Sequence, residues 1–246
     1  MEIRELPILI PTHKRVLDHR ERLRLEITMA NNKSINFILP QSIVREFRKQ
    51  NFGNVNFVGF SDSYFRSVKT YNAMLLNEDF WKVFSEFEQV VICQTDAILI
   101  KNLSELGTSS YDYIGARWGS RRCRLINGRI TINSKKHYLL PYRRLEIGNG
   151  GLSVRRVKTC ISIIRAITKM HQGEELRSGF NPEDIVFGYF LKKFRFALPS
   201  PRVVKTIFME DDALGLEEIP DVYGFHDLQS KNLELESKIF RKFSKL

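Results

Sequence analysis

The sequence has few cysteines, no long apolar run and, over one stretch, no acidic residue. Its three cysteines, Cys93, Cys123 and Cys160, are far apart and form no Cys-x-x-Cys pair. This argues against a zinc knuckle or a disulfide framework and favours a reducing compartment. No window approaches the roughly 18 apolar residues of a membrane span, and the apolar stretch from Pro7 to Pro11 is too short for a signal peptide. We expect a cytoplasmic protein, with peripheral attachment to the inner face of the cell membrane left open.

Positive charge is abundant. The 246 residues include 39 Lys+Arg against 28 Asp+Glu, a net charge of +11. Such an excess favours an anionic partner, which could be a nucleotide, a nucleic acid, a phospholipid surface or a phosphorylated glycolipid. Hydrophobic residues make up 43% of the chain, which excludes a disordered protein. The length suits one α/β domain.

Apolar strand-like runs alternate with amphipathic helical segments in the first hundred residues, which predicts an α/β fold with a mainly parallel sheet flanked by helices. We expect strands at 6–10, 35–39, 55–60, 90–93 and 98–100, and helices at 13–30, around 43–47 and as a pair over 61–87.

The second half is more basic. Residues 119–144 contain many Lys and Arg and no acidic residue; the segment could be a solvated surface or a site for an anionic acceptor such as a lipid-linked pyrophosphate. Asn127-Gly128 predicts a hairpin over 124–132. A strand at 152–154 and helices at 158–171, 182–194 and 231–246 follow. The last helix could lie on an anionic membrane, although we expect its apolar face to pack on the core.

Asp96 is the first residue that could carry chemistry. It follows the apolar run Val90–Cys93, in Gln94-Thr95-Asp96. Ligands of open α/β sheets bind outside the carboxyl ends of the strands, and a hard cation on a diphosphate needs only one or two protein oxygens. The alternative is a polar residue that simply ends a strand.

A glycine-rich loop, Gly148-Asn149-Gly150-Gly151, precedes the strand at 152–154. Its glycines would let the backbone approach a ligand closely and offer N–H groups to oxygen atoms. The spacing matches neither a P-loop nor a dinucleotide fingerprint, so a plain turn is the alternative.

The segment Asn181-Pro182-Glu183-Asp184 has the composition of a helix start, with Asn at the N-cap, Pro at the first helical position and acids in the first turn. Helix capping alone would explain it. The functional interpretation is a general base that takes the proton of an attacking hydroxyl.

His226 stands late in the chain in Tyr223-Gly224-Phe225-His226-Asp227. It could be a packed residue, a metal ligand or a diphosphate contact. No Gly-x-Ser-x-Gly elbow is present, which disfavours acyl-transfer hydrolysis.

In chain order, these segments resemble the core of a bacterial family that long lacked an assigned function and is similar to GT-A-fold glycosyltransferases. The resemblance runs from about Tyr64 to His226. It is carried by Tyr71-Asn72, 91–97, Tyr-Asp-Tyr-Ile-Gly-Ala-Arg-Trp at 111–118, Gly-Asn-Gly-Gly at 148–151 and Pro-Glu-Asp at 182–184.

The resemblance implies a single GT-A-like (Rossmann-like) domain over 1–246. It would transfer a sugar from a nucleotide-sugar, which we expect to be a UDP-sugar, to a hydroxyl of a glycan or glycolipid in surface polysaccharide synthesis, with inversion. Residues 1–118 would form the nucleotide-sugar-binding half, 119–230 the acceptor and catalytic half, and 231–246 a basic amphipathic helix. The implied donor-binding residues are Pro11, Thr12, Tyr71, Asn72, Gln94, Thr95, Asp96 and Arg117. The implied acceptor-binding residues are Trp118, Gly148, Asn149, Gly150 and Gly151.

The resemblance assigns the catalytic base to the pair Glu183-Asp184, with Asp184 favoured, and a metal to Asp96 and His226. Metal-dependent relatives carry Asp-x-Asp where this chain has Gln94-Thr95-Asp96, so the expectation of Mn²⁺ or Mg²⁺ is weak. Trp118 could equally stack on an acceptor sugar or fill the core.

Two other functions fit parts of the sequence. A non-catalytic basic module for nucleic acid or anionic lipid fits the net charge, but no nucleic-acid-binding motif is present, and we expect no nucleic-acid partner. A metal-dependent phosphodiesterase is the second alternative, but the sequence lacks the clustered acids and histidines of a two-metal site.

Overall fold

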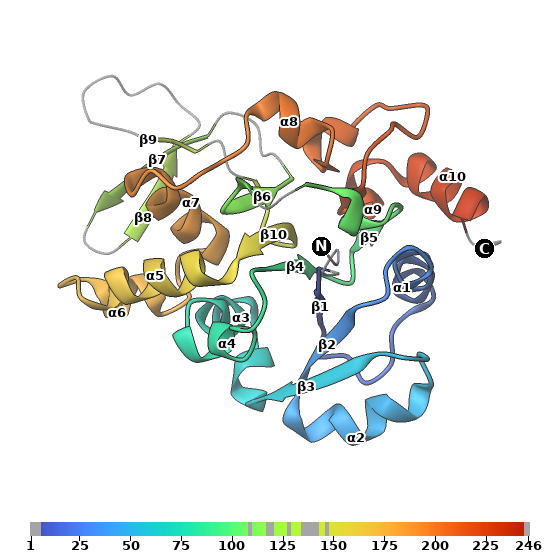
Figure 1. Cartoon of the computed structure of the whole chain (residues 1–246), viewed down its shortest axis with the longest axis horizontal. Helices are drawn as coiled ribbons and strands as arrows, with labels where there is room; N and C mark the ends of the chain where they lie inside the picture. The colour runs from blue at the N-terminus through green and yellow to red at the C-terminus, as the bar shows by residue number, and fades with distance from the viewer. Residues whose placement is uncertain are drawn as a thin grey trace.

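A computed structural model describes residues 6–107, 110–116, 121–126, 129–133, 143–145 and 148–243. Within these residues, the centre is a six-stranded sheet in the order β3-β2-β1-β4-β10-β6 (Figure 1). Its strands are β1 (Ile8–Pro11), β2 (Ile35–Pro40), β3 (Asn56–Phe60), β4 (Gln89–Cys93), β6 (Tyr113–Gly115) and β10 (Leu152–Arg156).

The sheet is mixed and mainly parallel. β1 pairs in parallel with both β2 and β4, and β2 pairs in parallel with β3. β10 runs antiparallel to its neighbours β4 and β6. The central strands β1 and β4 are almost entirely buried, as continuous apolar runs of a covered parallel sheet should be. The α/β class predicted from the sequence is confirmed.

Helices cover both faces of this sheet (Figure 1). Side chains alternate along β1, so that Leu9 faces a core with helices α3, α4, α5 and α7, and Ile8 and Ile10 face a second core that includes Leu25 of α1. The helices are α1 (His19–Asn31), α2 (Val44–Phe47), α3 (Val68–Leu75), α4 (Glu78–Lys82), α5 (Val157–Thr168), α6 (Gly173–Arg177), α7 (Glu183–Lys193), α8 (Pro201–Lys205), α9 (Leu228–Lys231) and α10 (Leu233–Phe243).

One predicted helix start and one predicted helix cap are wrong. The helix expected from residue 13 begins at His19, because Asp18 and Glu21 form a reciprocal capping box there. Asn181 does not cap α7: Pro182 occupies the N-cap without a side-chain hydrogen bond. The Asn181 side-chain oxygen instead accepts a hydrogen bond of 2.8 Å from the backbone N–H of Ile130.

Two smaller sheets flank the centre. One has the order β11-β12-β5 and consists of β5 (Ala97–Leu99), β11 (Phe208–Met209) and β12 (Gly224–His226). The other has the order β8-β7-β9 and consists of β7 (Arg121–Ile126), β8 (Arg129–Asn133) and β9 (Arg143–Leu145). β7 and β8 pair antiparallel with Ile126 opposite Arg129, so the hairpin predicted there is confirmed.

The C-terminal helix packs on the core, as expected. Leu235 and Ile239 of α10 are fully buried in a cluster with Ile27 of α1. Figure 1 shows these two helices side by side although they come from opposite ends of the chain. In the part of the chain that the structure describes, no helix combines the length and apolar character needed to cross a bilayer.

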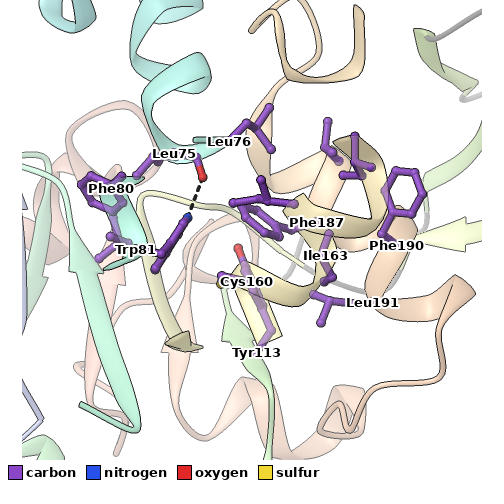
Figure 2. Close-up of a cluster of buried hydrophobic side chains, with 14 of the residues drawn as sticks. Leu75, Leu76, Phe80, Trp81, Tyr113, Cys160, Ile163, Phe187, Phe190 and Leu191 are labelled. Atoms are coloured by element: carbon purple, nitrogen blue, oxygen red, sulfur yellow. Dashed lines mark hydrogen bonds between the residues drawn. The ribbon is translucent and has the colours of Figure 1, made fainter. Parts of the chain in front are cut away.

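Trp81 anchors the core between α3, α4 and α7. Its side chain is fully buried, and Figure 2 shows its indole N–H directed at the carbonyl oxygen of Leu75, at 2.7 Å. That carbonyl belongs to the last turn of α3, where carbonyl groups lack intrahelical partners. Trp81 therefore also caps a buried helix end.

We predict that Trp81→Phe lowers the free energy of unfolding by about 2 kcal/mol, because it leaves the Leu75 carbonyl buried without a donor and removes part of the packed ring. Chemical denaturation followed by circular dichroism measures this. An unchanged midpoint would show that the indole N–H is not needed.

Candidate functional site

A cavity of about 640 Å³ opens at the carboxyl ends of β1 and β4. It is lined by Pro11 and Thr12 at the end of β1 and by Gln94, Thr95 and Asp96 directly after β4. The chain proceeds from β1 outward to β2 and β3 and then returns to place β4 on the other side of β1. Such a reversal of strand order is where open α/β sheets bind ligands. We call this cavity the cleft.

The two walls of the cleft differ in chemistry. Asp18, Glu21 and Arg24, spaced three apart at the start of α1, form a polar wall. On the other side, Phe65, Val68 and Tyr71 have the same spacing and present apolar and aromatic groups. Val68 is 77% exposed although it lines the cleft. Additional positive charge comes from Lys14 and Arg66.

Strand register brings Asp96 and His226 together. His226 on β12 pairs with Ala97 on β5, the residue after Asp96. The two side chains meet with 3.3 Å between His226 Nε2 and Asp96 Oδ1. On the other side of the ring, His226 Nδ1 lies 3.5 Å from Glu210 Oε1, and the same Glu210 oxygen accepts a hydrogen bond of 3.0 Å from Asn149 Nδ2. The imidazole is thus held between two carboxylates.

This arrangement sets the charges. Burial alone would lower the pKa of His226, but the contacts with Asp96 and Glu210 outweigh it and raise that pKa to about 9. Burial works to raise the pKa of Asp96, whereas the neighbouring His226 holds it below its ordinary value. At neutral pH an imidazolium therefore stands beside a carboxylate at the end of the cleft.

A raised histidine pKa stabilises the fold only while the ring is protonated. That contribution is complete below the unfolded pKa near 6.5 and is lost as the pH rises toward 9. We predict that the free energy of unfolding falls over this window by roughly 2 kcal/mol more in the wild type than in His226→Gln. Denaturation curves at successive pH values measure the difference, and parallel pH profiles for the two proteins would contradict the assigned charge.

The glycine-rich loop packs closely against side chains of the protein itself. A Cβ atom on Gly151 would lie 2.3 Å from His226 Nε2, and one on Gly150 would lie 2.1 Å from Glu183 Oε1. β10 pairs with β4 so that the backbone N–H of Gln94 donates to the carbonyl of Gly151 at 2.8 Å. The loop is therefore fixed next to the turn that carries Asp96.

The two acids at the start of α7 have different surroundings. Glu183 is buried and forms a double hydrogen bond with Arg155, at 2.7 and 2.9 Å. Arg155 is fully buried and also donates to the Gly150 carbonyl at 2.9 Å. Asp184 Oδ2 accepts a hydrogen bond of 3.1 Å from the Gly150 N–H. Burial, reinforced by the charge of Glu183, raises the pKa of Asp184 to about 7, which suits a group that accepts and releases protons near neutrality.

The residues predicted to bind the donor mostly converge. Six of them line the cleft: Pro11, Thr12, Tyr71, Gln94, Thr95 and Asp96. Asn72 is buried and is not among the lining residues. Arg117 and Trp118 lie outside the described residues, as do 119–120, 127–128 and 134–142 of the basic segment. Residues 148–151, predicted to bind the acceptor, are not among the lining residues; they adjoin the cleft through Gln94, which bonds to Gly151.

Sequence reasoning missed Glu210, Arg24 and the partnership of Arg155 with Glu183. Arg155 had a usable signal, since it directly follows the predicted strand at 152–154 and is a charged residue inside the buried strand β10. Glu210 and Arg24 had no such signal in the sequence, because their roles depend on contacts with residues that are distant in the sequence.

Among the described residues, no three His, Cys, Asp or Glu side chains are arranged to hold a metal ion. Asp96 Oδ1 and both ring nitrogens of His226 are nevertheless buried without a hydrogen bond of normal geometry. A cation that approaches from the cleft would meet the Asp96 carboxylate, and His226 could join as a ligand only after losing its proton.

Comparison with known proteins places the chain in a family. The model of a family described as a protein of unknown function (DUF5672) matches residues 54–226, and the chain belongs to that family. No curated protein matches the sequence significantly. The matched segment contains β4, the glycine-rich loop, the start of α7 and His226.

Proposed function

We propose that the protein is a glycosyltransferase with a GT-A-like fold, which moves a sugar from a nucleotide-sugar, in the first instance a UDP-sugar, to a hydroxyl of a glycan or glycolipid in bacterial surface polysaccharide synthesis. The observation that carries the proposal is the cleft at the reversal of strand order, with Asp96 at its end and the start of α7 next to the adjoining loop.

The two walls suit the two ends of a nucleotide. The ring of the base would stack on the wall of Phe65, Val68 and Tyr71, while a ribose hydroxyl would donate to the exposed carboxylate of Asp18. This orientation directs the diphosphate toward the Asp96 turn, and the sugar toward the glycine-rich loop.

Cleavage of the bond between the sugar and the diphosphate builds negative charge on the departing group. The His226 imidazolium would stabilise that charge in the buried environment between Asp96 and Glu210. A divalent cation, where bound, would be held by Asp96 with phosphate and water oxygens and would neutralise the same charge.

Asp184 would act as the base. Its carboxylate, aligned by the Gly150 N–H, would take the proton of the acceptor hydroxyl as that oxygen attacks the anomeric carbon. Attack opposite to the departing diphosphate inverts the anomeric configuration. Glu183 is committed to Arg155 and would support Asp184 through its charge.

A panel of nucleotide-sugars, with and without Mn²⁺, tests the proposal through release of free nucleotide. We expect release with at least one UDP-sugar, and thermal stabilisation by UDP. Absence of both, together with salt-dependent oligonucleotide or anionic-vesicle binding, would instead favour a basic binding module.

A further inference from the structure

The turn that carries Asp96 is held in place by helix α1. Arg24 donates from Nη1 to the carbonyl oxygen of Thr95 at 3.2 Å. The Thr95 hydroxyl donates to Glu21 Oε1 at 2.6 Å. Arg24 and Glu21 are both almost completely buried, so the backbone and the side chain of this turn are each fixed by an ionisable residue of α1.

Arg24 is in turn oriented by the C-terminal helix. Its Nε donates to Glu236 Oε1 of α10 at 2.7 Å, and its Nη2 lies 2.6 Å from the same oxygen. Glu236 is fully buried, and its other oxygen accepts a hydrogen bond of 2.6 Å from Arg20. A guanidinium held by a carboxylate in this way has a defined plane, so its remaining nitrogen, Nη1, is directed at Thr95.

We infer that Glu236 is a positioning residue: acting through Arg24, it fixes the Gln94–Asp96 turn and thereby the place of the Asp96 carboxylate in the cleft. Attachment of α10 does not require the ion pair, since Leu235 and Ile239 are fully buried beside it. Buried ion pairs can often be replaced by apolar pairs without loss of stability, so orientation is the better explanation for this one.

Arg24 and Glu236 both lie outside the segment that matches the family model, residues 54–226. Helices α1 and α10, which carry these two residues, would thus contribute to the site from outside the matched segment. The inference rests on the proposed function only for its kinetic readout.

The kinetic test compares Glu236→Gln with Glu234→Gln, an exposed glutamate on the same helix that pairs with Lys238. For Glu236→Gln we expect kcat for nucleotide release to fall about tenfold, with the donor KM changed less than threefold, because Arg24 and the rest of the cleft lining remain. The control should match the wild type in both constants. Equal kcat in all three proteins would overturn the inference.

The second test needs no substrate. The double variant Arg24→Met/Glu236→Leu replaces the ion pair by apolar side chains, and hydrogen exchange is followed in peptides that cover residues 93–99. The amides of Gln94 and Ala97, which donate to Gly151 and Gln94, should exchange at least tenfold faster, whereas those of α5 should be unchanged.

Wild-type exchange rates in the turn, in this variant or in Glu236→Gln, would overturn the inference, even if kcat falls. If the wild-type protein neither binds UDP nor releases nucleotide, the proposed glycosyltransferase function fails, while the exchange comparison still decides whether Glu236 holds the turn.

Discussion

Asparagine in place of Asp184 should lower kcat for sugar transfer about a thousandfold, because it removes the only proton acceptor that we assign to the incoming hydroxyl. Asp184 accepts backbone N–H bonds on both oxygens, from Gly150 and from Ile185. The single oxygen of asparagine can keep one of the two, so the fold should be retained at a cost of about 1–2 kcal/mol. Initial rates with the active nucleotide-sugar measure the effect. Asp79→Asn, an exposed acid on α4, is the matched control and should be fully active. Near wild-type turnover by Asp184→Asn would remove Asp184 from the mechanism.

The pH dependence of kcat follows from the same residues. A base must be unprotonated, so kcat should rise as the pH passes about 7, the pKa of Asp184. It should fall again as the pH passes about 9, where His226 loses the proton that stabilises the departing diphosphate. The two limbs report the coupled site as a whole. A flat profile between about pH 6 and 8, the window that brackets the pKa of about 7, would contradict the proposed base.

Glu183→Gln should lower the free energy of unfolding by about 3–5 kcal/mol, because it leaves the guanidinium of Arg155 buried without its counter-charge. Arg155 is fully buried, and Glu183 provides both oxygens of its double hydrogen bond. Denaturation by guanidinium chloride measures the loss.

The control for this effect is Glu175→Gln. Glu175 pairs with Arg129 at an exposed position, where ion pairs contribute less than about 1 kcal/mol. Equal, small losses in the two variants would contradict the structural role of the Arg155–Glu183 pair. Removal of the Glu183 charge should also lower the pKa of Asp184 and shift the acidic limb of the rate profile to lower pH.

Much of the fold was predictable because burial leaves a direct mark on sequence. The runs that became β1 and β4 are apolar on both faces, as strands covered by helices must be. Asp96 was predictable as a candidate for the same reason, since the polar residue after a buried strand lies at the sheet edge where ligands bind.

Residues that meet through long-range pairing were not predictable. The contact of His226 with Asp96 depends on the register of β12 against β5. Glu210 lies near His226 because it directly follows β11, which pairs with β12 in the same small sheet. The glycines of the loop were expected to admit a ligand. In the structure, Gly150 and Gly151 are required by the close approach of Glu183 and His226. Local composition also misplaced the cap of α7, because Asn181 bonds to Ile130 instead.

In the proposed function, one cleft holds a nucleotide diphosphate against the Asp96 turn. Diffraction from crystals of the protein grown with UDP would locate the nucleotide. We expect the base against Phe65, Val68 and Tyr71 and the diphosphate beside Asp96 and His226. A nucleotide bound elsewhere on the molecule, with the cleft between α1 and α3 left empty, would contradict it.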